Sequence, residues 1–331
     1  MILKISFIVC PNGFGHFRRL NTILDTIDLQ RFNVTIFTNE DAILSYCKRL
    51  KLNISKEITI KNIPNLPMFS DYQNKTSNET LEIFNFTENL EKESIVISDN
   101  YPEVFKFNDS GILLANFFWH KEITKFIDDK NYNYINSPKK RFITLGTIFS
   151  KSYVRSLKSF SQIGLFGNKK DSASRKNNRI LFVQGKGVWT ENYPWLFKSY
   201  IDKYLGKYDG EIVIDELLEN FEHPNLLKDT TYSSAKDFKN LDKFDFVIGR
   251  PSLGIVTDCL ERNIPFIPIY DKEDNEANHN AKIITDFYMV EGLDVTNMDF
   301  LLKNEAKINF NVSFSGAADL MNQINFMIDN G

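Results

Sequence analysis

The sequence predicts an α/β protein in which parallel sheets are covered by helices and are divided between two domains. Short apolar runs alternate with segments whose apolar residues recur at helical spacing, which is typical of such sheets. The 331 residues are enough for two domains of ordinary size. A basic stretch at residues 139–179 interrupts the pattern. We therefore expect two doubly wound domains joined in that region.

The first domain is expected over residues 1–150, beginning with an apolar strand at 2–9 that leads through a polar loop into an amphipathic helix. The later strands of this half are expected at 33–37, 95–98, 112–116 and, as the last one, 142–145. His16 and Asp99 then both follow the carboxyl ends of strands. Open α/β sheets bind their ligands at that edge, so both residues are candidates for a site.

The second domain is expected over residues 179–314, after a basic linker at 151–178. Its strands are expected to begin at 179 and to recur near 212–214, 230–232, 246–248 and 266–268. Its helices are expected at 195–205, 254–262 and 280–286. A closing amphipathic helix at 315–331, with Ala318, Met321, Ile324 and Ile328 on its apolar face, is expected to pack back on the first domain.

Composition excludes several classes of function. The net charge of −3 carries no signature of a nucleic-acid binder, so we expect no nucleic-acid partner. Cys10, Cys47 and Cys259 match no metal or disulfide spacing, which is typical of reduced thiols in a cytoplasmic protein. The apolar residues 2–9 are too few for a signal peptide or a membrane span.

The basic stretch at 139–179 holds eleven Lys and Arg residues against the single acid Asp171. Charge runs of this kind are usually solvated loops. The alternative is a surface that docks an anionic acceptor or the inner face of a membrane, where each cation contributes on the order of 1 kcal/mol near anionic lipid. Both interpretations stand at the level of the sequence.

In the second half, a polar loop leads from a buried strand into a helix. The first N–H groups of a helix lack partners within it and carry a partial positive charge, so Ser252, Gly254 and the amides that follow are candidates to hold a phosphate. Asp258 lies one helical turn further on. If the phosphate belongs to a nucleotide, this carboxylate is suited to a sugar hydroxyl.

Three patches together resemble the glycosyltransferases of the GT-B fold: Gly13-Phe14-Gly15-His16-Phe17-Arg18-Arg19, residues 249–260 and residues 276–281. The most similar branch contains the N-acetylglucosaminyltransferase of peptidoglycan synthesis, the nucleotide-sugar-dependent transferases of secondary metabolism and the UDP-sugar hydrolase of the pseudaminic acid pathway. The resemblance implies two Rossmann-like domains that face a cleft, with the donor nucleotide on the second domain and the acceptor on the first.

The resemblance also implies a set of residues that bind the donor. They are Gly185, Lys186, Gly187, Arg250, Ser252, Leu253, Gly254, Asp258, Glu276 and Asn280. Asp258 matches the family's acid, usually Glu, that holds the ribose. Ala277 departs from the family, which has Gln at this position to contact the sugar. That contact then comes from Glu276, Asn278 or His279, or is absent.

On the acceptor side, the resemblance implies His16 as general base, with Asp99 as the acid that orients it. The other residues expected on this side are Gly13, Gly15, Arg19 and His120. A histidine with an ordinary pKa of about 6.5 is suited to deprotonate a hydroxyl, and a neighbouring carboxylate fixes its tautomer. Helix amides and cations are suited to the departing diphosphate, so we expect no metal and no cofactor.

The sequence therefore predicts an inverting, metal-independent hexosyltransferase that moves a sugar from a nucleoside diphosphate, in the first place UDP, to a sugar or glycolipid acceptor, as in the assembly of a cell-surface polysaccharide. The alternatives are a nucleotide-sugar hydrolase and a sugar-nucleotide-binding protein without turnover. A dinucleotide fingerprint at Gly13-x-Gly15 with Glu40 is disfavoured because Arg18 replaces its third glycine.

Single residues also keep simpler interpretations. His16 could be a structural cap, Asp99 could form an Asx turn, and Asp258 could be a solvated residue of its helix. His120, which follows three aromatic residues, could be a packed side chain.

Overall fold

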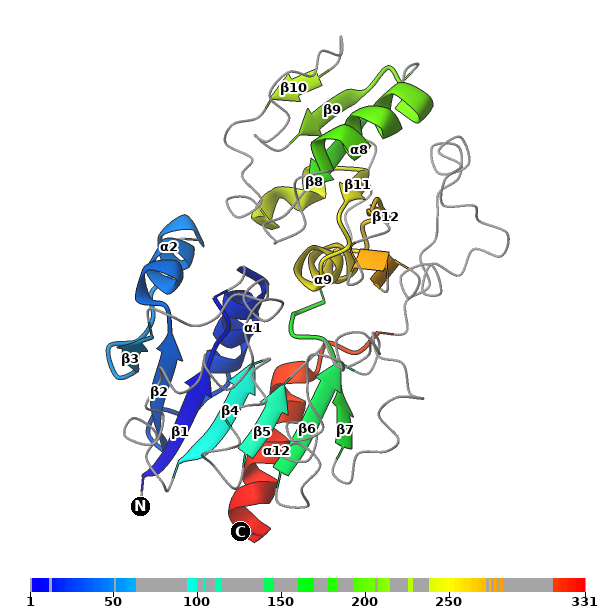
Figure 1. Ribbon diagram of the computed structural model, residues 1–331. Coiled ribbons are helices and arrows are strands. Elements are labelled where there is room, and N and C mark those ends of the chain that lie inside the picture. Colours follow the sequence, from blue (N-terminus) through cyan, green and yellow to red (C-terminus); the bar gives the residue numbers. More distant parts are fainter. Residues whose placement is uncertain are drawn as a thin grey trace. The chain divides into compact units, whose positions relative to one another are not determined.

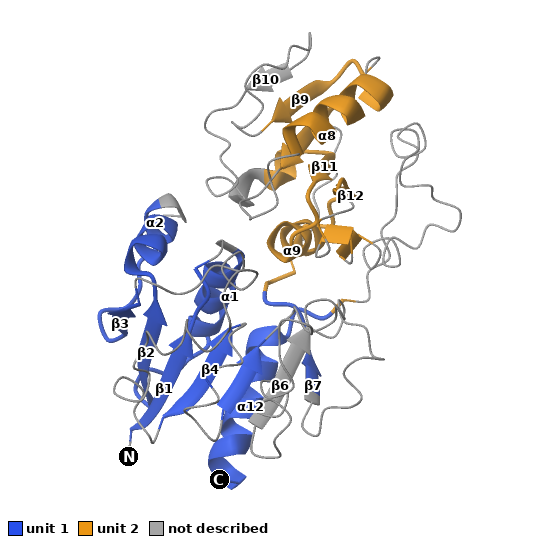
Figure 2. Ribbon diagram, viewed as in Figure 1, with its two compact units in different colours: residues 1–166, 313–331 blue, residues 167–312 orange. Residues whose placement is uncertain are grey.

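The computed structural model divides the chain into two compact units, residues 1–166 with 313–331 and residues 167–312 (Figure 2). The first is called unit 1 and the second unit 2 below. The structure describes residues 2–11, 14–50, 52–63, 94–99, 104, 111–114, 140–145, 160–169, 178–183, 193–205, 208–214, 226–228, 238–271, 274, 277–278, 280–281 and 312–330.

The described part of unit 1 contains a seven-stranded parallel sheet in the order β3-β2-β1-β4-β5-β6-β7 (Figure 1). Its strands are β1 (Leu3–Ile8), β2 (Phe32–Thr38), β3 (Thr59–Asn62), β4 (Ile95–Asp99), β5 (Gly111–Leu114), β6 (Lys140–Leu145) and β7 (Phe160–Ile163). Its helices are α1 (Phe14–Leu24), α2 (Glu40–Leu50) and α12 (Gly316–Asn330). The strand order reverses between β1 and β4, and ligands of open α/β sheets bind at the carboxyl ends of strands at such a point.

The five strands expected in this half are confirmed as β1, β2, β4, β5 and β6. The expectation that 142–145 is the last of them is wrong, because β7 follows and pairs with β6. Residues 160–163 therefore belong to the sheet, although the sequence placed them in a basic linker. Both unpredicted strands, β3 and β7, lie at an edge of the sheet and have no two consecutive apolar residues, so they lack the apolar run that marks a buried strand.

The closing helix α12 belongs to unit 1 and lies against α1 and β7. Its buried residues include Ala317, Leu320 and Ile324, whereas Ala318 is exposed, so the expected apolar face is wrong by one position at its start. The reason lies at the amino end of the helix. Gly316 lies so close to the carbonyl oxygen of Gly164 that a Cβ there would clash with it, and the buried face of α12 begins at this position and continues through Ala317 and Leu320.

The described part of unit 2 contains a five-stranded parallel sheet in the order β10-β9-β8-β11-β12. Its strands are β8 (Arg179–Val183), β9 (Glu211–Ile214), β10 (Leu226–Lys228), β11 (Phe246–Gly249) and β12 (Phe266–Pro268). Its helices are α8 (Tyr193–Tyr200), which continues as a π-helical segment (Ile201–Leu205), a 3-10 helix (Phe238–Lys243) and α9 (Leu253–Glu261). The strand expected at 230–232 and most of the helix expected at 280–286 lie outside the described residues.

The core of unit 2 forms where α8 covers the sheet. Tyr193, Phe197, Ile201 and Leu205 recur every fourth residue and are buried among the apolar side chains of β8, β9 and β11. The order reverses between β8 and β11, which places the switch point of unit 2 at the carboxyl ends of these two strands. The carboxyl end of β11 leads into the candidate phosphate loop.

Two expectations from composition can be compared with this structure. Cys10 and Cys259 are buried, Cys47 is partly buried, and no disulfide joins any two of these three described residues. Within the described ranges, no helix combines the length and the apolar character that crossing a membrane requires.

Candidate functional site

The first candidate cluster lies at the switch point of unit 1. β1 and β4 are parallel neighbours with Ile8 opposite Ser98, so the start of α1 and the end of β4 meet at one edge of the sheet. His16 in the first turn of α1 and Asp99, the last residue of β4, are in contact there. The distance from His16 Nδ1 to Asp99 Oδ2 is 3.0 Å. The structure thus brings together the two residues that the sequence selected as base and orienting acid.

Arg19 completes this cluster from the next turn of α1. Its Nη1 donates to Asp99 Oδ1 over 2.9 Å, and its guanidinium carbon lies 5.9 Å from the centroid of the Phe166 ring. The side chains of His16, Arg19 and Asp99 are only 12%, 7% and 8% exposed. The guanidinium that the sequence assigned to the acceptor side therefore binds the orienting carboxylate. Sequence spacing gave no signal for this contact or for Phe166.

The charges of the cluster favour a protonated histidine. Burial disfavours the imidazolium, but the Asp99 carboxylate and then Cys10, which also hydrogen-bonds to His16, outweigh it and raise the pKa of His16 from 6.5 to about 10. Burial also opposes ionisation of Asp99, yet Arg19 and His16 together hold the pKa of that carboxyl below its usual value. At neutral pH the cluster is therefore an imidazolium, a carboxylate and a guanidinium, and His16 can accept a proton only after it has lost one.

This pKa predicts how stability depends on pH. Because the folded pKa of His16 exceeds its unfolded value, the contribution to the free energy of unfolding is complete below about pH 6.5 and is lost as pH rises toward about 10. The melting temperature of the wild type is expected to fall over this range relative to His16→Gln, by about 2–4 °C for each kcal/mol lost. Thermal unfolding of both proteins at several pH values measures this difference, and parallel curves would contradict the raised pKa.

Gly15 precedes His16 in the first turn of α1 and is exposed. In the part of the chain that the structure describes, no atom lies within 4 Å of where its Cβ would be. Packing within the described structure therefore does not require a glycine at this position. The open space beside it is what the approach of a ligand requires. Gly13 and His120, the other two expected acceptor-side residues, lie outside the described residues.

We expect Gly15→Ala to separate folding from function. Alanine is favoured over glycine in a helix by about 1 kcal/mol, so the melting temperature should stay level or rise. Turnover should fall if an acceptor approaches this position. Thermal unfolding and steady-state kinetics on the same preparation test both halves, and undiminished turnover would remove Gly15 from the acceptor side.

The second candidate cluster lies at the switch point of unit 2, where β11 leads into α9. Gly249 ends β11 opposite Val183 at the end of β8, and a Cβ on Gly249 would lie 2.0 Å from the Val183 carbonyl oxygen. Ser252 is the N-cap of α9 and has an extended backbone, without a side-chain capping hydrogen bond. Leu253 and Gly254 begin the helix. The amino end of a nine-residue helix therefore follows directly from the switch point.

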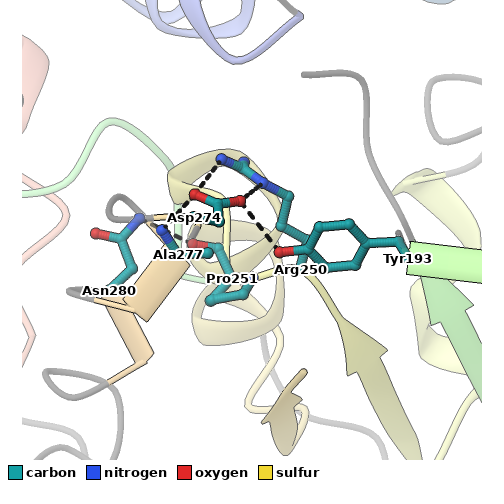
Figure 3. A network of polar contacts seen from close by, with 6 residues as sticks. All are labelled: Tyr193, Arg250, Pro251, Asp274, Ala277 and Asn280. Atoms are coloured by element: carbon teal, nitrogen blue, oxygen red, sulfur yellow. Dashed lines mark hydrogen bonds and ion pairs between the residues drawn. The ribbon is translucent and has the colours of Figure 1, made fainter. Parts of the chain in front are cut away.

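A buried ion pair holds this loop. Arg250 donates through Nε to Asp274 Oδ2 over 2.7 Å and through Nη2 to Asp274 Oδ1 over 3.2 Å (Figure 3). Asp274 also accepts from the hydroxyl of Tyr193 and from the backbone N–H of Ala277. Arg250 is 6% exposed and Asp274 is 1% exposed. Burial and then Asp274 raise the pKa of Tyr193 far above its usual value, so its hydroxyl keeps its proton and donates it.

A second contact ties the same loop to the segment around residue 280. The Asn280 side chain donates through Nδ2 to the carbonyl oxygen of Pro251 over 2.8 Å. Asn280 thus binds the backbone next to the N-cap of α9 instead of facing solvent. Sequence reasoning selected Arg250 and Asn280 but missed Asp274 and Tyr193. One signal was present, since an Asp three residues before a helical Ala277 has the spacing of a capping residue.

Asp258 lies inside α9 and is 2% exposed, so its interpretation as a solvated helix residue is wrong. Its Oδ1 is 3.7 Å from Arg262 Nη1, and that nitrogen donates to the Asp258 carbonyl oxygen and to Glu261 Oε2. Its assignment to a ribose stays a prediction. The remaining expected donor residues, Gly185, Lys186, Gly187 and Glu276, lie outside the described residues.

Among the described residues, no group of three or more His, Cys, Asp or Glu side chains is placed to hold a metal ion.

Comparisons with known proteins identify the fold. No protein-family model matches the sequence, and no curated protein sequence matches it. Solved structures resemble the chain over nearly its whole length. The glycotransferase of kitacinnamycin has a TM-score of 0.61 at 9% identity and covers 99% of this chain and 96% of its own. The calicheamicin glycosyltransferase CalG4 has a TM-score of 0.60 at 11% identity, with coverages of 99% and 98%.

Arabidopsis thaliana UGT89C1, complexed with UDP, has a TM-score of 0.61 at 12% identity and covers 98% of this chain and 100% of its own. These structures are GT-B glycosyltransferases, and the chain has their two-domain α/β fold, as the sequence predicted. At such low identities the likeness establishes the fold alone.

Proposed function

We propose that the protein is a glycosyltransferase that moves a sugar from a nucleoside diphosphate to a hydroxyl acceptor. The observation that carries this proposal is the β11–α9 loop, which places the amino end of α9 at the switch point of unit 2 within a GT-B fold. Two structures of that fold support it, because Arabidopsis UGT89C1 is complexed with UDP and the spinosyn rhamnosyltransferase SpnG with thymidine diphosphate. The latter has a TM-score of 0.53 at 12% identity.

The donor's diphosphate would lie at the first turn of α9, where the backbone N–H groups of residues 253–255 carry partial positive charge. Arg250 would not neutralise it directly, since both of its contacts above are to Asp274. The amides would therefore stabilise the charge that develops on the leaving oxygen, and no divalent ion is needed for that purpose. Addition of a chelator should leave turnover unchanged.

On the acceptor, His16 would act as the general base. The acceptor oxygen forms a bond to the anomeric carbon while the bond from that carbon to the diphosphate oxygen breaks, and the acceptor's proton passes to His16. A single displacement of this kind inverts the anomeric carbon. Asp99 would hold the imidazole in place and stabilise its protonated form. With water as the acceptor, the same steps would hydrolyse the donor.

The proposal extends to the finer assignments made from the sequence: UDP as the nucleotide, a sugar or glycolipid of a cell-surface polysaccharide as the acceptor, and a cytoplasmic location. The strands β6 at 140–145 and β7 at 160–163 argue against a continuous basic loop at 139–179, which was the surface expected to contact a membrane. Sedimentation with anionic vesicles at low and high salt tests that contact.

The deciding experiment is a calorimetric screen of UDP, GDP, dTDP, CMP and NAD, followed by a UDP-release assay with UDP-N-acetylhexosamines. Binding of a nucleoside diphosphate and release that depends on an added hydroxyl acceptor support the transferase. Rapid release without an acceptor indicates the hydrolase. Binding without release across the acceptor panel indicates a binding protein, and a preference for NAD overturns the proposal.

A further inference from the structure

Three segments of unit 2 meet on one buried carboxylate, that of Asp274 (Figure 3). Arg250 reaches it from the loop before α9, Tyr193 reaches it from the first residue of α8, and the backbone N–H of Ala277 reaches it from the helical segment that follows. Oδ2 accepts from Arg250 and Tyr193, and Oδ1 accepts from Arg250 and Ala277. Both carboxylate oxygens thus bind two donors each.

All three segments come from the carboxyl ends of neighbouring strands. α8 follows β8, Arg250 follows β11 directly, and Asp274 follows β12, and these strands are adjacent in the order β8-β11-β12. Asp274 therefore links the segments that follow β8, β11 and β12, at the sheet edge that contains the switch point of unit 2. The Asn280 contact to Pro251 holds the same loop from a second side.

The charges indicate what this arrangement does. Arg250 and Asp274 neutralise each other, and the side chain of Asp274 is fully buried. A carboxylate so placed cannot touch a diphosphate, which it would also repel. The ion pair does fix the backbone from residue 250 to the N-cap Ser252, and hence the direction in which the first amides of α9 point.

We propose that Asp274 is a positioning residue for the donor's diphosphate, acting through Arg250 and Tyr193 on the loop that precedes α9. This inference rests on the donor site proposed above. It assigns Arg250 a role in loop geometry instead of direct phosphate contact, and it gives Asp274 and Tyr193 a share in donor affinity. It also predicts that the network affects the binding of the donor's phosphates and leaves the binding of its nucleoside unchanged.

The mildest test is Tyr193→Phe, which removes one hydroxyl from Asp274 and keeps the ring that packs on Phe197. The affinity for UDP is expected to fall roughly threefold to tenfold, the effect expected for the loss of one typical intramolecular hydrogen bond. Tyr200→Phe is the matched control on the same helix. Its buried hydroxyl has no hydrogen-bond partner in the described structure, so UDP affinity should not change.

The ion pair itself is tested with a pair of variants. Asp274→Asn leaves Arg250 without its countercharge in a buried place, and such a protein can fail to fold. The double variant Arg250→Met with Asp274→Leu replaces both charges by apolar side chains of similar size, which proteins generally tolerate. The double variant leaves no unpaired charge but deprives the Tyr193 hydroxyl and the Ala277 N–H of their acceptor, so it should fold with a somewhat lower melting temperature and bind UDP at least about tenfold more weakly.

Two readouts separate positioning from general damage. Calorimetry with UDP and with uridine should show that the variants lose affinity for UDP but not for uridine, because only the former has phosphates. Hydrogen exchange of the free proteins should show faster exchange of amides 250–256 in Tyr193→Phe and in the double variant, with β8 and β9 unchanged. Tyr200→Phe should match the wild type in both measurements.

The proposal is overturned if Tyr193→Phe and the double variant bind UDP like the wild type, or lose UDP and uridine equally, or leave the exchange of amides 250–256 unchanged. A different result separates it from the proposed function. If the wild type binds no nucleoside diphosphate, the donor site is wrong, and the role of Asp274 in donor positioning falls with it, whatever the exchange measurement shows about the loop.

Discussion

At a pH near 10, where His16 is largely neutral, replacement of His16 by glutamine is expected to lower kcat roughly 10²–10⁴-fold, the usual contribution of a general base. Glutamine can still hydrogen-bond to Asp99 but cannot accept the proton of the acceptor. The affinity for a nucleoside diphosphate should stay at the wild-type value, because the proposed donor loop lies in unit 2 and His16 in unit 1. Steady-state kinetics with the donor found in the nucleotide screen, together with calorimetry, measure the two quantities.

The dependence of turnover on pH provides the control for this assignment. With the pKa of His16 raised to about 10, kcat/KM in the wild type should rise about tenfold per pH unit through the neutral range and level off toward that pH. Asp99→Asn removes the carboxylate that raises this pKa and should move the plateau to lower pH. A profile that is flat between pH 6 and 10, or kcat retained in His16→Gln, would exclude His16 as the base.

Replacement of Gly249 by alanine adds a single methyl group, and we expect it to reduce both the stability of unit 2 and its affinity for nucleotide strongly. The added Cβ would lie 2.0 Å from the Val183 carbonyl oxygen, a backbone atom that cannot move aside without separating β11 from β8. Overpacking of this kind costs about 1–3 kcal/mol, and here it also displaces the loop at Arg250. Nucleotide affinity should therefore fall at least about tenfold.

Calorimetry and thermal unfolding check this result, with Gly15→Ala as the matched substitution at a glycine that has open space around it. Gly249→Ala should lose both stability and nucleotide affinity, whereas Gly15→Ala should lose neither. If Gly249→Ala bound nucleotide like the wild type, the β11–α9 loop would not be the donor site.

The sequence was sufficient for the main elements and for the selection of His16 and Asp99 in unit 1, but not for the contact of Arg19 with Asp99. Buried parallel strands read as apolar runs, and residues that follow such runs fall at one sheet edge, so the meeting of His16 and Asp99 required only the order of β1 and β4. The edge strands β3 and β7 were beyond this reasoning, because strands with few apolar residues resemble loops. Such segments become strands because a neighbouring strand pairs with them, and this pairing leaves no pattern in the spacing of residues along the chain.

The cluster in unit 2 was predictable only in part, because its contacts join segments that are far apart in sequence. Asp274 lies 24 residues from Arg250 and 81 from Tyr193, and neither separation has a local pattern. Ala277 illustrates the limit. The sequence marked it as a missing Gln, whereas the structure shows a fully buried residue whose backbone N–H binds Asp274. A longer side chain there would have to displace its neighbours.

The division of the chain into two units has a consequence for how the protein is made. Unit 2 is one continuous segment, whereas unit 1 consists of residues 1–166 and 313–331. Two backbone hydrogen bonds join these two segments of unit 1: the N–H of Leu165 donates to the carbonyl oxygen of Ser313, and the N–H of Gly316 donates to that of Leu165. During synthesis, unit 2 can therefore emerge and fold while unit 1 still lacks α12, the helix that covers α1. Fragments that end before residue 313 are expected to aggregate through this uncovered face, whereas residues 167–312 are the better choice for isolated study.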